Sequence, residues 1–223
     1  MKRRKFIKKS GLSVGGMLTF AQVKANTSIL STDNQTIKSP VCIATWNVEN
    51  ATRAAWSVLK EDGSALDAVE TGAKIEEADV NNQTVGKGGR PDREGNVTLD
   101  ASIMDHQGNC GSVVCMQNIT HAISVARKVM EETPHVMLAG KGAEQFALEQ
   151  GFQAEDLLTS KSAEDYQKWL ETSNYEPVIN IENHDTIGIL ALDAKGNLAG
   201  GCTTSGMAYK MAGRVGDSPI IGA

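Results

Sequence analysis

The sequence is poor in aromatic residues, in proline and in long apolar runs. Phe, Trp and Tyr make up 4% of the 223 residues, and there are 5 prolines. No apolar run reaches the roughly 20 residues that a transmembrane helix needs, so we expect no membrane partner. Glycine is plentiful at 22 residues, and 40% of the chain is hydrophobic and 22% charged. Such values are ordinary for a globular protein and favour helices and strands joined by tight turns.

Cysteine and histidine are also scarce, with 4 of each. Cys42, Cys110, Cys115 and Cys202 form no C-x-x-C pair and show no metal-binding spacing to the histidines. We therefore predict no metal and no cofactor.

Basic residues are scarce outside the first 25 residues. Residues 1–25 hold seven of the 22 Lys and Arg and no acidic residue, and they run from MKRRKFIKKS through a short apolar stretch to Ala25. This pattern is typical of an export signal, and the Arg3-Arg4 pair resembles a twin-arginine signal, so we expect a bacterial periplasmic or secreted protein. The remainder has 15 basic and 27 acidic residues, a net charge of −12. That charge disfavours nucleic acid and anionic membranes and favours a small-molecule partner.

The rest of the chain has the periodicity of an α+β protein. Residues 26–40 are polar and aperiodic and predict a flexible lead-in. Capping boxes are expected at Ser64 with Asp67 and at Ser162 with Asp165. The expected strands are 41–47, 96–105, 111–117, 135–140, 186–192 and 198–206, and the expected helices are 51–60, 64–79, 123–133, 142–151 and 162–172. Because strands come in groups rather than in strict alternation with helices, we expect helices layered on antiparallel sheets.

The most informative stretch is NIENHDTIGILALD, 180–193, in which Asn-His-Asp stands directly against Thr186. The apolar residues after Thr186 predict a strand buried on both faces. A threonine hydroxyl is a weak nucleophile without an adjacent base, and a free α-amine with a pKa of about 7.7–8.0 can serve as that base. The Asp185 carboxylate can take the Thr186 hydroxyl proton, and the oxygen can then attack the Asp185 carbonyl carbon. Hydrolysis of the resulting ester would free the amine; an ordinary loop-to-strand junction is the alternative on local chemistry.

Longer stretches resemble one family of enzymes. The segments are NHDTIG, TWN (45–47), GGRPDREGNVTLDASIMD (88–105), TPHVML (133–138) and CTTSGMAYKMAGRVGDSPIIGA (202–223). They are similar to glycosylasparaginases, also called aspartylglucosaminidases, which are N-terminal nucleophile hydrolases. The resemblance implies a four-layer αββα sandwich and self-cleavage between Asp185 and Thr186, giving an α chain (41–185) and a β chain that begins with 186–223. It also implies hydrolysis of the amide that joins N-acetylglucosamine to an asparagine side chain.

The same resemblance implies the roles of single residues. Thr186 is the expected nucleophile and general base. Thr204 is expected to supply the hydroxyl beside the nucleophile, and Trp46 is expected to line the site. Arg214 and Asp217 are expected to bind the α-carboxylate and the α-ammonium of the substrate's asparagine moiety. A guanidinium group fits a carboxylate bidentately, which agrees with that role. The resemblance further implies associated α and β chains and a dimer of αβ units.

Several alternatives stay open. An isoaspartyl peptidase or plant-type L-asparaginase would share the nucleophile and the recognition of aspartyl groups. His184 either orients the junction before Thr186 or only fills space, whereas His106, His121 and His135 are expected to be structural or surface residues. Members of the family continue well past the SPIIGA that ends this sequence. A partial sequence is therefore one alternative, and an inactive truncated remnant that neither cuts itself nor hydrolyses substrate is another.

Overall fold

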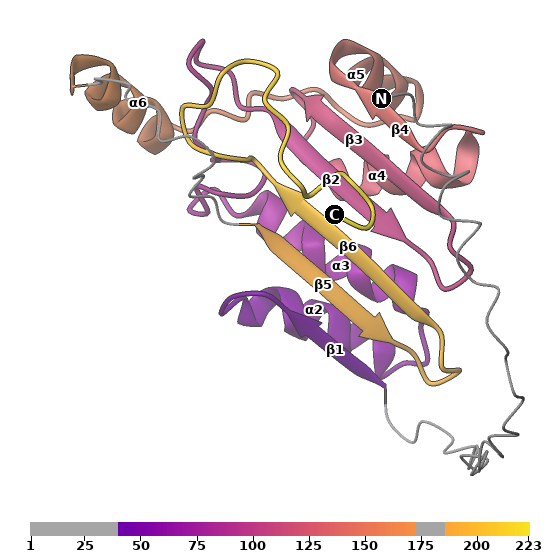
Figure 1. Cartoon of the computed structure of the whole chain (residues 1–223). Coiled ribbons are helices and arrows are strands. Elements are labelled where there is room, and N and C mark those ends of the chain that lie inside the picture. Colours follow the sequence, from indigo (N-terminus) through magenta and orange to yellow (C-terminus); the bar gives the residue numbers. More distant parts are fainter. Residues whose placement is uncertain (1–39, 173–185) are drawn as a thin grey trace, which may run out of the picture. The chain divides into compact units, whose positions relative to one another are not determined.

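One six-stranded sheet organises the described part of the chain. The computed structural model describes residues 40–172 and 186–223; the expected export signal, nearly all of the lead-in, and His184 with Asp185 lie outside the described residues. The strand order is β1-β5-β6-β2-β3-β4 (Figure 1). Neighbours are antiparallel except β3 and β4, which are parallel. The strands are β1 (Val41–Ala44), β2 (Leu99–Met104), β3 (Cys110–Met116), β4 (Met137–Ala139), β5 (Ile187–Leu192) and β6 (Leu198–Thr204).

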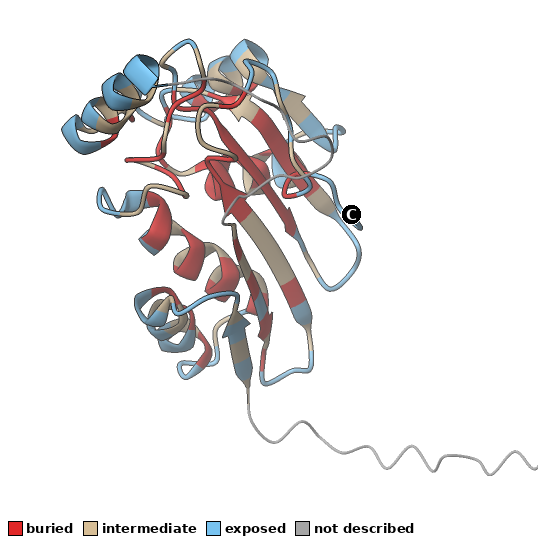
Figure 2. Ribbon diagram, turned by 60° about the vertical axis from the view of Figure 1, so that its left-hand side comes forward, coloured by how far each residue is buried: buried red, intermediate tan, exposed pale blue. Residues whose placement is uncertain are grey.

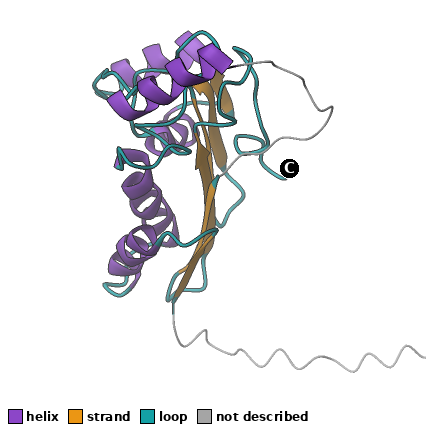
Figure 3. Ribbon diagram, turned by 90° about the vertical axis from the view of Figure 1, so that its left-hand side faces the viewer, coloured by secondary structure: helices purple, strands orange, loops and turns teal. Residues whose placement is uncertain are grey.

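Helices cover one face of this sheet, as the nearly edge-on view of Figure 3 shows. The core lies between that face and the helices, where buried residues concentrate (Figure 2). The helices are α2 (Glu49–Leu59), α3 (Ala65–Ala78), α4 (Ala122–Glu132), α5 (Gly140–Glu149) and α6 (Ser160–Thr172). The α+β class and the approximate position of every predicted element in the described ranges are thus confirmed.

The expectation that the strand after Thr186 is buried on both faces is wrong for the described residues. Ile187, Ile189 and Ala191 are at most 2% exposed on the helix-covered face, whereas Leu190 on the opposite face is 48% exposed. The reason is that α2 and α3 pack on one face only, while the opposite face is covered in part by the loop after β6 (Figure 3). The strand does lie inside the sheet, since β5 pairs with β1 on one side and β6 on the other.

The two predicted capping boxes differ in outcome. Ser64 caps α3 as expected, because its hydroxyl oxygen accepts a hydrogen bond from the Asp67 N–H at 3.1 Å. Ser162 is not a cap, because α6 begins at Ser160 and places Ser162 within the first turn. Its N–H donates to the Thr159 hydroxyl at 3.3 Å, and its own hydroxyl donates to the Gly88 carbonyl. The Ser162 side chain, which the local sequence predicts to cap the helix, therefore makes a tertiary hydrogen bond instead.

No helix in the described ranges is long and apolar enough to cross a membrane.

Candidate active site

Thr186 stands immediately before β5, and its carbonyl is held by the chain end of β1. The Thr45 hydroxyl and the Trp46 indole N–H both donate to the Thr186 carbonyl oxygen, each at 3.0 Å. Thr45 is bound to Gly188 as well: its hydroxyl accepts from the Gly188 N–H at 3.0 Å, and its own N–H donates to the Gly188 carbonyl at 2.9 Å. The β1–β5 pairing thus places TWN directly against Thr186, although 140 residues separate Trp46 from Thr186 in the chain.

Trp46 stands in the turn after β1, beside Thr186. Its backbone has a positive φ of 62°, and its ring is 67% exposed, so the indole projects from the turn after β1 rather than into the core. It lines a hollow of about 250 Å³ together with Val48, Asn82, Thr84, Val85, Thr186 and Ile187. An exposed indole that donates to the Thr186 backbone leaves its ring face available to a ligand in this hollow.

Thr204, at the end of β6, stands opposite Thr186, which directly precedes the neighbouring strand β5. Ile187 of β5 pairs with Thr203 of β6 in antiparallel register, so the next pair outward along the same register is Thr186 with Thr204. The Thr204 side chain is 2% exposed; its hydroxyl donates to the Thr84 carbonyl at 3.3 Å and accepts from the Gly206 N–H at 2.9 Å. Directly opposed positions in a sheet carry their side chains on the same face, so the two hydroxyls share one face.

A serine that the sequence analysis did not single out approaches the Thr186 hydroxyl. Ser218 Oγ lies 3.3 Å from Thr186 Oγ1, and either hydroxyl can be the donor. The Ser218 carbonyl accepts from the Ser102 hydroxyl at 2.6 Å, which ties this segment to the middle of β2. The signal that could have found Ser218 is its place in GDSP, directly after Asp217. Thr45 was missed although it stands beside Trp46, because a hydroxyl at the end of a strand is common.

Arg214 and Asp217 both lie on the loop that follows β6. The Arg214 guanidinium packs against two glycines: a Cβ on Gly216 would stand 2.8 Å from Nη1, and one on Gly206 would stand 3.3 Å from it. Asp217 is exposed and lines a groove of about 810 Å³ that runs over the face of the sheet opposite the helices. That groove also touches Ser102, Cys202 and Ser218.

The predicted site residues that the structure describes therefore gather at one end of the sheet. Thr186, Trp46 and Thr204 are in contact or in register, and the loop of Arg214 and Asp217 reaches Thr186 through Ser218. Asp185 lies outside the described residues. At Gly188, two residues after Thr186, a Cβ would meet only the Thr45 methyl group at 3.6 Å, so no group packs closely against this glycine. Within residues 40–172 and 186–223 no group of His, Cys, Asp and Glu could hold a metal ion.

Comparison with known proteins identifies the chain's relatives. The family model described as "Asparaginase" matches residues 26–223. The chain belongs to the asparaginase family. It is 56% identical over 222 residues to the N(4)-(beta-N-acetylglucosaminyl)-L-asparaginase of Elizabethkingia miricola, covering 99% of this chain and 65% of that protein. It is 40% identical to the protein of the same name in Rattus norvegicus and 39% identical to that in Mus musculus, covering 82% of this chain and 62% of each relative.

This asparaginase-family chain thus spans less than two thirds of the length of these curated relatives. The stretch that carries Trp46, Thr186, Thr204, Arg214 and Asp217 lies inside the residues matched by the family model.

Proposed function

We propose that this protein is a glycosylasparaginase, which hydrolyses the amide between N-acetylglucosamine and an asparagine side chain. The observation that carries the proposal is the 56% identity to the Elizabethkingia miricola protein of that name. The geometry around Thr186 supports it, because a threonine hydroxyl lies at the start of a strand with two donors on its carbonyl and a second hydroxyl 3.3 Å away.

The first step of the proposed mechanism is self-cleavage between Asp185 and Thr186. The Thr186 hydroxyl loses its proton to the Asp185 carboxylate, and its oxygen attacks the Asp185 carbonyl carbon. The C–N bond breaks, the acyl group moves to oxygen, and the nitrogen takes the proton from the Asp185 carboxyl group and becomes an amine. Water then hydrolyses the ester, which restores the hydroxyl and leaves Thr186 as a new N-terminus. The Thr45 and Trp46 hydrogen bonds fix the carbonyl of Thr186 during these steps.

The second step is hydrolysis of the substrate. The α-amine of Thr186, with a pKa of about 7.7–8.0 in model compounds, takes the hydroxyl proton. The oxygen attacks the carbonyl carbon of the asparagine side chain, the glycosylamine leaves with the proton, and water hydrolyses the aspartyl ester to release aspartate. Thr204 supports the nucleophile from the opposed position on β6.

Recognition of the amino-acid end falls to the loop after β6. The Arg214 guanidinium binds the α-carboxylate, and Asp217 binds the α-ammonium. Because both groups exist only in a free asparagine moiety, substrate within a peptide is expected to be turned over very poorly. Arg214→Ala is expected to raise the KM for glycosylated asparagine, with a total loss of about 3–5 kcal/mol of transition-state binding. Equal turnover of substrates with free and blocked α-groups would contradict this assignment.

We also propose the finer architecture and the assembly. The face of the sheet opposite the helices leaves Leu190, Leu198 and Met104 more than a third exposed, and apolar surface of this kind is normally buried against another layer. This supports a second layer, as in a four-layer αββα sandwich. The α and β chains would remain associated after cleavage and pair into a dimer of αβ units, and residues 1–25 would direct export to the periplasm or the medium.

The proposal is tested by following self-cleavage and hydrolysis together. Thr186→Ala is expected to leave one uncut chain by mass spectrometry, and Thr186→Ser to be cut more slowly than the wild type. Thr172→Ala, which removes an exposed hydroxyl at the end of α6, is the matched control and is expected to be cut normally. Normal cleavage of Thr186→Ala, or an uncut wild-type protein, would contradict the mechanism.

An L-asparaginase or isoaspartyl peptidase is the second candidate, and the observation that favours it is the description of the matching family model. Supplying glycosylated asparagine, L-asparagine and a β-aspartyl dipeptide at equal concentration separates the two. Faster release of aspartate from the glycosylated substrate is expected.

A further inference from the structure

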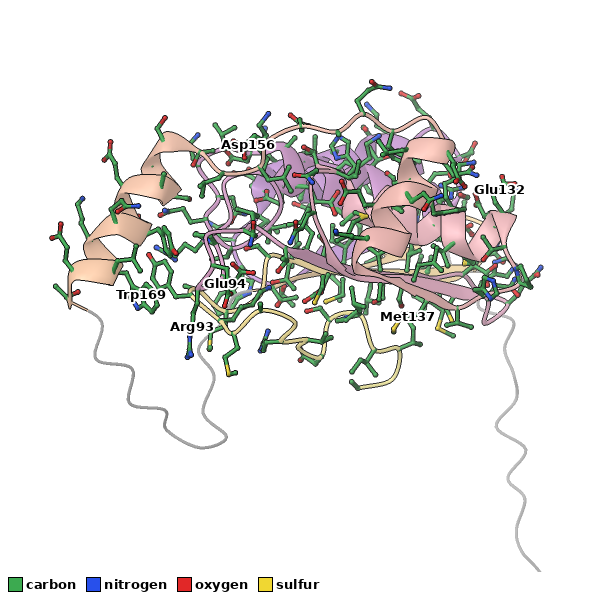
Figure 4. All side chains as sticks on the ribbon, turned by 90° about the horizontal axis from the view of Figure 1, so that it is seen from above. Arg93, Glu94, Glu132, Met137, Asp156 and Trp169 are labelled. Atoms are coloured by element: carbon green, nitrogen blue, oxygen red, sulfur yellow. The ribbon has the colours of Figure 1, made fainter. Side chains whose placement is uncertain are left out.

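The loop after β6 carries Ser218 and lies on the face of the sheet opposite the helices, as the view from above in Figure 4 shows. A buried lysine fixes the first part of this loop. Lys210 is 1% exposed, and its ammonium donates to the Ser205 carbonyl at 2.7 Å and to the Thr98 carbonyl at 3.5 Å. Thr98 directly precedes β2 and Ser205 directly follows β6, so this one side chain joins the loop to the ends of two neighbouring strands.

Ser218 is itself fixed against the middle of the sheet. Its carbonyl accepts a hydrogen bond from the hydroxyl of Ser102 in β2 at 2.6 Å, and the residue is 7% exposed. The Ile220 N–H donates to the Asp217 carbonyl at 2.8 Å, which closes a turn around Ser218 and Pro219. A proline also restricts the backbone of the residue before it. The Ser218 hydroxyl is therefore presented from a fixed position.

That hydroxyl contacts the expected nucleophile. Ser218 Oγ lies 3.3 Å from Thr186 Oγ1, although 32 residues separate the two in the chain. The distance is longer than the roughly 2.7–2.8 Å of a typical O–H···O hydrogen bond. The contact is therefore weak in the resting protein and can shorten when charge develops on one of the oxygens. Only an interaction that becomes stronger in the transition state accelerates a reaction.

The proposed self-cleavage determines which hydroxyl is the donor. The Thr186 hydroxyl has a single proton, and in the proposed first step this proton goes to the Asp185 carboxylate. Thr186 Oγ1 can then only accept from Ser218. As the proton leaves, negative charge grows on Thr186 Oγ1, and a hydrogen bond to a charged oxygen is roughly twice as strong as one to a neutral oxygen.

We propose that Ser218 is a catalytic residue for self-cleavage, and that it donates a hydrogen bond to the Thr186 oxygen as this oxygen attacks. The inference rests on the proposed function, because it assumes that the Thr186 hydroxyl attacks the Asp185 carbonyl carbon. The role belongs to the transfer of the acyl group from nitrogen to oxygen. In that step the bond between Thr186 Oγ1 and the Asp185 carbonyl carbon forms and the C–N bond breaks. The proton held by the Asp185 carboxyl group passes to the nitrogen, and Ser218 keeps its own proton throughout.

The first test is the rate of self-cleavage during cell-free synthesis, followed by mass spectrometry of the uncut chain. Ser218→Ala is expected to slow cleavage about 10- to 100-fold, the range for the loss of one hydrogen bond to a charged group. Ser218→Thr keeps the hydroxyl and should recover most of the rate. Ser57→Ala removes an exposed hydroxyl in α2 and is the control, so it should be cut at the wild-type rate.

A change of nucleophile separates this role from a purely structural one. In Thr186→Cys a thiol replaces the hydroxyl, and a thiol with a pKa of about 8.5 forms its anion with less help than an alcohol. Adding Ser218→Ala to Thr186→Cys is therefore expected to slow cleavage less than about threefold. A serine that only shaped the loop would slow cleavage equally with either nucleophile.

A thermal melt of each variant shows whether it folds, and Ser218→Ala is expected to melt close to the wild type. If it does not fold, Ser218→Cys takes its place, because a thiol keeps the size of the side chain and is only a weak donor. If Thr186→Cys is not cut at all, the comparison of Ser218→Thr with Ser218→Ala decides the question.

Three results would overturn the inference: wild-type cleavage of Ser218→Ala, a Ser218→Thr protein that is cut no faster than Ser218→Ala, or an equal loss with threonine and with cysteine at position 186. A wild-type protein that stays uncut would instead overturn the proposed function, and the inference with it.

Discussion

The hydroxyl of Thr45 gives the sharpest test of how the Thr186 backbone is held. It donates to the Thr186 carbonyl and accepts from the Gly188 N–H, each at 3.0 Å. Thr45→Val removes both hydrogen bonds while keeping the branched shape of the side chain. The backbone hydrogen bond from the Thr45 N–H to the Gly188 carbonyl and the indole hydrogen bond from Trp46 to Thr186 remain. The strand should therefore stay paired, with a less fixed residue at its start.

The size of the effect follows from the exposure of the site. A hydrogen bond contributes about 1 kcal/mol net, and Thr45 is exposed, so water can replace part of each lost bond. The two together give at most about 2 kcal/mol of lost stability. For a chain of this size that corresponds to a fall in Tm of about 4–8 °C. If the same loss falls on the transition state for self-cleavage, the rate drops about 10- to 30-fold.

The assay follows the uncut chain by mass spectrometry after expression, beside a thermal melt of each variant. Thr45→Ser keeps the hydroxyl and is the matched control, so it should cut at close to the wild-type rate. A Thr45→Val protein that cuts at the wild-type rate would show that this hydroxyl does not position Thr186, whatever its Tm.

Two further predictions concern stability. A Cβ on Gly111 of β3 would stand 2.1 Å from the Ala126 carbonyl oxygen of α4. Gly111→Ala should therefore overpack this contact and lower the free energy of unfolding by about 1–3 kcal/mol or more, as measured by urea titration. Gly142→Ala in α5 is the control, because an added Cβ there would have no neighbouring atom within 4 Å. Its free energy of unfolding should rise by about 0.5–1 kcal/mol. Burial opposes ionisation of Asp193, but hydrogen bonds from Asn197 and neighbouring N–H groups outweigh it and lower the pKa. The stability that Asp193 adds is therefore present above its unfolded pKa of about 3.9 and is lost as pH falls through the lower folded pKa. Asp193→Asn should destabilise the protein at pH 7 and differ little from the wild type at strongly acidic pH; an equal difference at both would refute the assignment.

Local pattern was enough to find the elements but not their ends. The stretch around α6 offers several hydroxyl residues as possible caps, and the pairing of Ser162 with Asp165 looks like the best box. The folded chain uses both side chains elsewhere: the Ser162 hydroxyl donates to the Gly88 carbonyl, and Asp165 accepts from the Gln83 side chain at 2.8 Å. Contacts more than 70 residues away in the chain decide this, and no local rule contains them.

The candidate site likewise contains residues that the sequence predicts and residues that it does not. Thr186, Trp46 and Thr204 follow from motifs and from a resemblance that spans them. Their neighbours Ser218 and Lys210 depend on how the loop after β6 returns over the sheet, which the sequence does not specify locally. A lysine is ordinarily exposed, so nothing in its local sequence predicts that Lys210 is buried.

The two threonines at the end of β6 make hydrogen bonds that do not depend on the proposed cleavage. Thr203 faces the helices, where its hydroxyl donates at 2.7 Å to Glu77, a carboxylate with 0% exposure that also accepts from the Ile123 N–H of α4 at 2.9 Å. Thr204 faces the other way and donates to the Thr84 carbonyl. Consecutive residues thus fix the strand from both faces at the position opposite Thr186. Because these bonds belong to β6 and not to the Asp185–Thr186 peptide, the proposed cleavage would not break them.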